Sequence, residues 1–141
     1  MKSLCYLAVL GLLITAPAFA GNEPEGCSNR MLAGRWMFAT DVGHQSKFPG
    51  GDITAIGVFR LDRQGTLTDG IFDATVEGWR FLQGVTFTGT LTINANCTGT
   101  LYFVTSAGTT RTDSVIVLGP GHFRGMSQDT TSLWTYDARR L

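Results

Sequence analysis

The 141-residue sequence predicts an all-β domain, an antiparallel up-and-down β-barrel of about eight strands. From Leu32 onward, short runs rich in Thr, Val, Ile and Phe follow one another, and none has helical periodicity of useful length. Turn residues interrupt these runs about every ten to fifteen positions, which is the spacing of a hairpin-linked meander. Several runs also alternate apolar and polar side chains, as half-buried strands do.

Glycine, asparagine and proline mark the clearest breaks between the runs, because they accept the backbone angles that tight turns need. These breaks fall at residues 48–51, 62–65, 94–96, 107–108 and 119–121. Strands are therefore expected at residues 33–42, 52–61, 65–73, 78–84, 85–93, 98–106, 110–118, 121–127 and 131–139. The boundaries within 65–84 leave the count at eight or nine.

Alternation is clearest between residues 86 and 93, where Phe87, Leu91 and Ile93 share one face and threonines fill the other. A sheet of eight hairpin-linked strands would leave two long edges exposed, whereas closure into a barrel removes them. A two-sheet β-sandwich is the alternative, since periodicity alone does not separate the two architectures.

The N-terminal residues 1–20 have the three parts of a secretory signal peptide. Lys2 is their only charge, residues 4–14 are apolar, and Ala18-Phe19-Ala20 is a small-x-small cleavage site. We expect cleavage after Ala20, a leader over residues 21–31, and one barrel domain over residues 32–141. The protein would then be secreted or periplasmic.

The expected mature chain of 121 residues has ten basic and eleven acidic side chains. Such a balance provides no basic field for a phosphate backbone, so nucleic acid is not an expected partner. No polybasic cluster or second apolar segment indicates a stable membrane anchor. The sequence does not determine the oligomeric state.

Cys27 and Cys97 are the two cysteines that remain after removal of the signal peptide, which contains Cys5. In an oxidising compartment they are expected to form one disulfide, and a pair of free thiols is the alternative. A bridge across their 70-position separation would stabilise the fold by roughly 4 kcal/mol on the chain-entropy model.

The first expected strand begins with Gly34-Arg35-Trp36, and a Gly-x-Trp at this place resembles the calycin group of lipocalins, avidins and related barrels. That resemblance implies that Trp36 closes the barrel floor and that Arg139, or its neighbour Arg140, packs over the indole. Turn and strand residues of 57–67 and 94–101 are similar to exported barrels of the allene-oxide-cyclase-like group. No residue set matches a cyclase active site.

Asp41 and His44 lie close together at the end of the first expected strand, where a carboxylate beside an imidazole could transfer protons. Glu77 is a third candidate for such a role. The histidines have no metal-ligand spacing, so no metal is expected. No nucleotide- or phosphate-binding motif is present, and no cofactor is expected.

Aromatic residues on several expected strands suggest an aromatic-lined lumen. The expected ligand-binding residues are Trp79, Phe81, Phe103, Arg124, Trp134 and Tyr136. Arg80, Arg124, Asp113 or Glu77 would supply a polar group that orients the ligand.

Three functions are compatible with this sequence. The first is binding of a small, largely apolar molecule in the lumen of an exported barrel. The second is an isomerase or cyclase that acts on a small hydrophobic substrate in the same cavity. The third is a secreted protein–protein module such as a protease inhibitor, with residues 21–31 as its binding arm.

Overall fold

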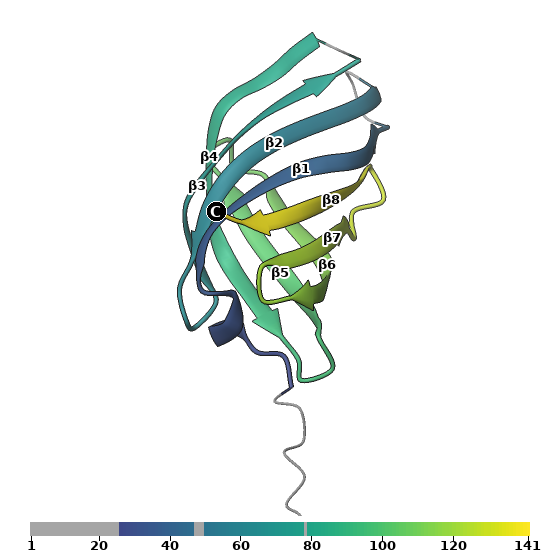
Figure 1. The fold of residues 1–141 in the computed structure, drawn as a ribbon. Helices are drawn as coiled ribbons and strands as arrows, with labels where there is room; N and C mark the ends of the chain where they lie inside the picture. Colours follow the sequence, from purple (N-terminus) through teal and green to yellow (C-terminus); the bar gives the residue numbers. More distant parts are fainter. Residues whose placement is uncertain (1–25, 47–49, 78) are drawn as a thin grey trace, which may run out of the picture.

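A computed structural model describes residues 26–46, 50–77 and 79–141, with the backbone alone at residues 79–81. It contains a closed antiparallel barrel in which each strand pairs with the next and the last pairs with the first (Figure 1). The strands are β1 (Gly34–Gln45), β2 (Gly51–Leu61), β3 (Thr66–Val76), β4 (Trp79–Ile93), β5 (Thr98–Thr105), β6 (Thr110–Gly119), β7 (His122–Ser127) and β8 (Ser132–Arg140). The predicted up-and-down barrel is confirmed, and the sandwich alternative is excluded. Within the described residues, no helix is long and apolar enough to cross a membrane.

One strand boundary predicted from the sequence is wrong. The expected strands at 78–84 and 85–93 are a single strand, β4, which runs through Gly84 with a shift of register against β3. Gly84 has a φ of 56°, and its N–H donates to the Asp73 carboxylate at 2.6 Å. A glycine inside a strand often marks such a bulge, and periodicity alone does not distinguish a bulge from a turn.

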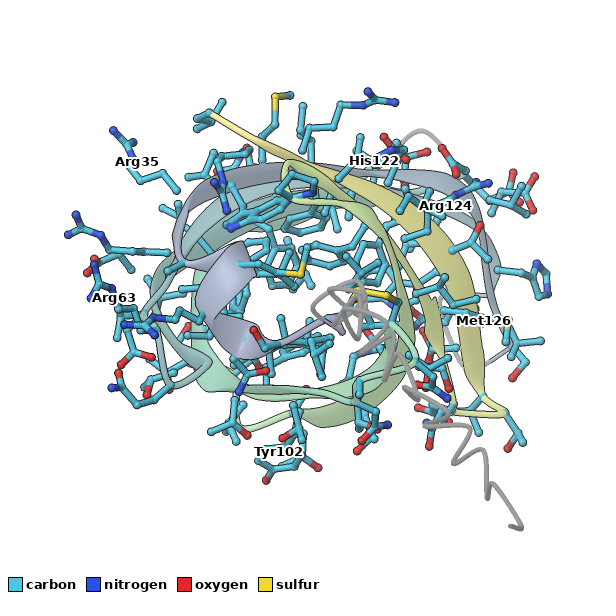
Figure 2. All side chains as sticks on the ribbon, turned by 60° about the horizontal axis from the view of Figure 1, so that its bottom comes forward. Arg35, Arg63, Tyr102, His122, Arg124 and Met126 are labelled. Carbon is cyan, nitrogen blue, oxygen red and sulfur yellow. A yellow bond between two sulfur atoms is a disulfide. The ribbon has the colours of Figure 1, made fainter. Side chains whose placement is uncertain are left out.

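Pairing between β1 and β8 closes the barrel, with a register that extends from Trp36–Arg140 to Gln45–Ser132. At one end of the barrel, a short 3-10 helix, η1 (Asn29–Leu32), lies across the opening (Figure 2). The Trp36 indole N–H donates to the Leu32 carbonyl at 2.8 Å, and both side chains are fully buried. The Phe123 ring packs on Trp36 at a centroid distance of 4.9 Å. This end is therefore a packed floor.

Of the two arginines expected over Trp36, Arg140 is the one that lies there, and Arg139, which was named first, does not. The Arg140 guanidinium carbon lies 5.4 Å from the indole centroid, and Nη2 donates to the Met31 carbonyl. Arg139 instead bonds the Asp137 carboxylate on the outer surface at 2.8 Å. Neighbouring residues of a strand point to opposite faces, so only one of the two arginines can reach the floor.

The predicted Cys27–Cys97 disulfide is present and ties the start of the described chain to the turn between β4 and β5. Cys27 N–H also donates to the Ala95 carbonyl at 3.2 Å. The Asn29 side chain donates to the Gln64 carbonyl and accepts from the Ile93 N–H. Cys27 and Asn29 of the expected leader thus hold it against two turns of the barrel. The expected signal peptide, its cleavage site and residues 21–25 lie outside the described residues.

The contacts of Arg140 predict that Arg140→Met destabilises the fold by about 1–2 kcal/mol, through loss of the cation–π contact and of a charged hydrogen bond. Arg139→Met is the matched control, and loss of its surface ion pair should cost about 0.5 kcal/mol or less. Urea unfolding followed by tryptophan fluorescence measures both variants. Equal losses would contradict the assignment of Arg140 as the floor cation.

Candidate functional site

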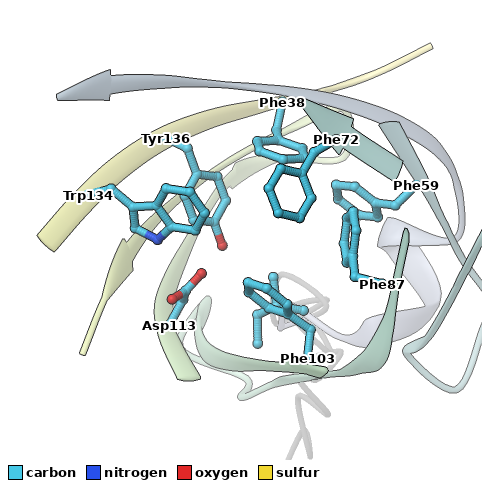
Figure 3. Close-up of a pocket in the computed structure, with 9 residues that line it drawn as sticks. Phe38, Phe59, Phe72, Phe87, Phe103, Asp113, Trp134 and Tyr136 are labelled. Carbon is cyan, nitrogen blue, oxygen red and sulfur yellow. The ribbon is translucent and has the colours of Figure 1, made fainter. Parts of the chain in front are cut away.

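The barrel interior contains a small cavity, called here the chamber, of about 20 Å³. This volume is close to that of a single water molecule. Figure 3 shows the nine residues that line the chamber, of which seven are aromatic. They are Phe38, Phe59, Phe72, Phe87, Leu101, Phe103, Asp113, Trp134 and Tyr136.

Among the described residues that line the chamber, the polar side chains lie together on one wall. Figure 3 shows the carboxylate of Asp113 facing the Tyr136 hydroxyl and the Trp134 indole nitrogen, across from the Phe59 and Phe87 rings. Asp113 is 0% exposed. Among the described residues, neither Asp113 oxygen, nor Trp134 Nε1, nor the Tyr136 hydroxyl has a hydrogen-bond partner. Buried polar groups are normally paired, so this cluster indicates a site for a missing polar group.

Burial raises the pKa of the Asp113 carboxyl to about 6, because the apolar lumen disfavours its charge. The Tyr136 hydroxyl, the Arg111 charge and the Trp134 indole N–H offset part of this rise. The hydroxyl and the indole N–H lie close to the carboxylate, although neither forms a well-aligned hydrogen bond with it. Burial and the nearby carboxylate in turn raise the pKa of Tyr136 well above its usual value. The chamber therefore contains a carboxyl group that titrates near pH 6 and a phenol that stays protonated.

Gly125 on β7 makes room for Tyr136 on β8, with which it is directly paired. A Cβ atom at position 125 would lie 2.1 Å from the Tyr136 ring. No side chain can occupy that space, so this glycine fixes where the phenol can lie.

A second cavity opens above the chamber, at the end of the barrel opposite the floor. This mouth cavity, called here the cup, has a volume of about 480 Å³. Small-molecule sites have volumes of about 300–1,000 Å³. The cup is lined by Gln45, Ile53, Phe72, Ala74, Leu82, Val85, Phe103, Thr105, Ala107, Thr109, Arg111, Asp129, Thr131, Ser132 and Trp134. Phe72, Phe103 and Trp134 line both cavities and therefore form the partition between them.

Among the described residues that line the cup, Arg111 is the one basic side chain, and its guanidinium group already forms hydrogen bonds. Its Nη1 donates to the Ser127 hydroxyl and the Ser132 carbonyl, and Nη2 donates to the Ser132 hydroxyl. The guanidinium carbon lies 4.5 Å from the centroid of the Trp134 ring. Partial burial lowers the pKa of Arg111, and the charges of Asp113 and Asp129 oppose that effect. Arg111 thus holds Trp134 in position while remaining a cation.

Three of the residues predicted to bind a ligand, Phe103, Trp134 and Tyr136, line the interior. Trp79 and Phe81 belong to β4, but their side chains are outside the description. Arg124 is placed differently from the prediction. It points outward from the barrel (Figure 2), its side chain is 54% exposed, and it pairs with Asp41. On β7, Phe123 and Gly125 take the inward positions, so Arg124 cannot line the lumen.

The structure does not bring the predicted acid–base candidates together. Register shifts around Thr40–Val42 mark an irregularity in β1, and Asp41 and His44 both lie on the exposed surface. Asp41 pairs with Arg124, whereas His44 Nδ1 lies 3.5 Å from the Asp52 carboxylate. Glu77 accepts a hydrogen bond from the Asp52 N–H at 3.1 Å. These three residues line neither cavity, so the structure does not place the expected acid–base pair of Asp41 and His44 in the barrel interior.

A separate ion cluster on the outer face surrounds Asp137. His122 Nε2 contacts this carboxylate, Arg139 bonds it, and Arg124 Nε lies 4.0 Å away. The hydrogen bond from His122 is the main reason that the pKa of Asp137 is lowered. The described residues contain no group of three or more His, Cys, Asp or Glu side chains that could hold a metal ion.

The sequence interpretation missed Arg111 and named Asp113 only as one of four possible polar groups. A usable signal was present, because Arg111 and Asp113 have the same alternation parity as Val115 and Val117, which are buried on β6. Two charged residues in phase with a buried apolar stripe indicate charges inside the barrel.

No family model matches the chain, and no curated protein matches it. Solved structures of designed barrels are similar to it in fold. A redesigned β-barrel, b11L5F_LGL, aligns with a TM-score of 0.55 at 16% identity, over 80% of this chain and 94% of that one. The redesigned barrel mFAP1, bound to DFHBI, has the same TM-score at 15% identity, over 80% and 97% of the two chains. EF1p2_mFAP2b, also bound to DFHBI, has 13% identity, with coverage of 80% and 98% and a TM-score of 0.55.

The raised pKa of Asp113 predicts how stability depends on pH. In the unfolded chain this carboxyl ionises near pH 3.8, whereas in the barrel it keeps its proton up to about pH 6. Its contribution to stability is complete below about pH 3.8 and is lost as the pH rises through 6, a change on the order of 3 kcal/mol. Asp113→Asn removes this titration, so its stability relative to the native sequence should rise between about pH 4 and pH 7.5.

Urea unfolding at the two pH values measures this difference. Asp69→Asn is the control for loss of a carboxylate at the surface, because asparagine also accepts the left-handed backbone of that position, where φ is 52°. Parallel pH profiles for Asp113→Asn and the native sequence would contradict the assignment.

Proposed function

We propose that the mature protein binds a small, largely apolar molecule inside the barrel, with the body of the ligand in the cup. The observation that supports this most directly is the contrast between the two ends of the barrel. The floor is packed with buried side chains around Trp36, whereas the other end keeps a cavity of about 480 Å³. A barrel of about eight strands can either fill its interior or hold one small ligand.

The composition of the cup supports an apolar ligand with few polar groups. Ile53, Ala74, Leu82 and Val85 supply aliphatic walls, and Phe72, Phe103 and Trp134 form the inner end. Polar side chains, among them Thr105, Thr131 and Ser132, complete the lining. Apolar walls with a small number of placed polar groups are typical of small-molecule sites.

We further propose that the protein acts outside the cytoplasm and is related to the calycin group. The Cys27–Cys97 disulfide supports an oxidising compartment. The floor of the barrel supports the relationship, since Trp36 lies there at the head of the first strand beneath Arg140.

Proton transfer in the same lumen is a second candidate function, and Asp113 is the observation that favours it. A carboxyl group with a pKa of about 6 in an apolar cavity can act as a general acid or base near neutral pH. The Tyr136 hydroxyl and the Trp134 indole N–H could stabilise negative charge on a substrate oxygen beside it. Under this function, Asp113→Asn would abolish turnover of a substrate and leave its binding largely intact.

Binding can be tested with N-phenylnaphthylamine, a neutral apolar dye that fluoresces when it leaves water. We expect saturable binding to the native sequence, with a dissociation constant that Ala74→Phe weakens by about tenfold or more, because the phenyl ring occupies part of the cup. Ala74 is buried and lines the cup, whereas Ala39 lies on the exposed outer face of β1.

Ala39→Phe is therefore the matched control, since it is the same substitution on the opposite face of the sheet. Its dye affinity should equal that of the native sequence. Absence of saturable dye binding to the native sequence, or equal weakening by both variants, would overturn the proposed function. Circular dichroism of both variants shows whether the barrel is still folded.

A further inference from the structure

We propose that the ligand carries a primary ammonium group, which enters the chamber beside Asp113 while its apolar body stays in the cup. This inference rests on the proposed function and assigns the chemical class of the ligand.

The first argument is the hydrogen-bonding capacity of the polar wall. Both oxygens of Asp113 lack a partner among the described residues, although the side chain is fully buried. An ionised carboxylate has about four acceptor sites, whereas Trp134 and Tyr136 can supply one hydrogen each. The wall therefore has more acceptors than donors, and the group that completes it must donate hydrogen bonds. An ammonium group supplies three N–H donors and accepts none.

The second argument is charge. Of the described residues that line the chamber and the cup, three are charged, namely Arg111, Asp113 and Asp129. Asp113 is the fully buried one of the two carboxyl groups, and neither of its oxygens has a hydrogen-bond partner among the described residues. The charges of Asp113 and Asp129 both act on Arg111, whose donors are already bonded to Ser127 and Ser132. A buried charge without a counter-charge is costly, and a cationic ligand would compensate it.

The third argument is the shape of the two cavities. The chamber has room for about one water molecule, and an ammonium group is similarly compact. Seven of the nine lining side chains are aromatic, and the faces of aromatic rings attract cations. Because Phe72, Phe103 and Trp134 line both cavities, a ligand must pass between them to place its head beside Asp113.

A ligand carboxylate at Arg111 is the main alternative, and the structure disfavours it. The guanidinium already stacks on Trp134 and bonds two serines, so it offers less unused hydrogen-bonding capacity than Asp113 does. A ligand anion in the chamber would also be repelled by the ionised carboxylate of Asp113.

The proposal predicts a pH dependence whose sign is fixed. An alkylamine stays protonated below about pH 9, so the titration seen between about pH 5 and pH 8 belongs to the protein. Among the described residues, the charged or titratable side chains that act on Asp113 are Arg111 on its own strand and Tyr136 on β8. Asp129 acts on Arg111 in turn. Its register partners, Leu101 on β5 and Ser127 on β7, do not titrate in this range. Amine affinity should therefore rise with pH as Asp113 ionises.

Three ligands of nearly equal shape test the inference, namely naphthylmethylamine, naphthylmethanol and naphthoic acid. Each is titrated against the complex of the native protein with N-phenylnaphthylamine, and displacement of the dye gives its affinity. We expect the amine to bind about tenfold more tightly than the alcohol at about pH 7.5, and the acid to bind more weakly than both. At about pH 5 the preference for the amine over the alcohol should disappear.

Two carboxylate variants locate the effect. Asp113→Asn should bind amine and alcohol equally at about pH 7.5, whereas Asp41→Asn, on the outer face, should keep the full preference. The pH profile of the native protein decides the question even where Asp113→Asn does not fold. Dye binding without any preference for the amine would overturn this inference and leave the proposed function standing. Absence of dye binding would overturn the proposed function itself.

Discussion

The interior of this protein depends on the pairing of β1 with β8, which joins the two ends of the meander. Closure satisfies the backbone hydrogen bonds of both edge strands, which would otherwise remain open to other chains. It also divides every strand into an inward and an outward face. Each side chain is thereby assigned either to a water-excluded lumen or to solvent, and the chemistry of the molecule follows from that assignment.

The two ends of the lumen are used differently. At the floor, Trp36, Leu32 and Phe123 fill the space, and the disulfide from Cys27 holds η1 against the adjoining turns. At the mouth, the side chains do not fill the interior, and the cup remains. The packed floor therefore lies at the opposite end of the barrel from the site proposed to bind a ligand.

Asp113 is the costly element of the interior. Its burial raises its pKa to about 6, so near neutral pH the empty barrel holds a charge that its surroundings disfavour. Carboxyl groups whose pKa is raised by burial in a cavity cluster at functional sites. A ligand cation beside Asp113 would remove this cost, which links the stability of the fold to occupancy of the site. The same carboxylate is the group on which the proposed proton transfer would depend.

Most of the fold could be predicted from the sequence, because turn residues and two-residue alternation are local signals. They predict the order of the strands, and the cost of two open edges favours a barrel over a sandwich. The disulfide prediction depends on the two cysteines together with the expected oxidising compartment. The bulge at Gly84 could not be separated from a turn, since glycine serves in both.

The site was less predictable, because it depends on which face each strand turns inward and on how deep each residue lies. Neighbours in sequence such as Asp41 and His44 were expected to act together, yet the irregularity in β1 places them with different partners on the outer surface. Asp113, Trp134 and Tyr136 come from β6 and β8, which are separated by β7, and they meet only on the inner wall of the closed barrel. The sequence by itself determined the strands and the residue types available to the interior. Only the tertiary structure decided which polar side chains are buried away from solvent, because burial depends on closure of the whole sheet.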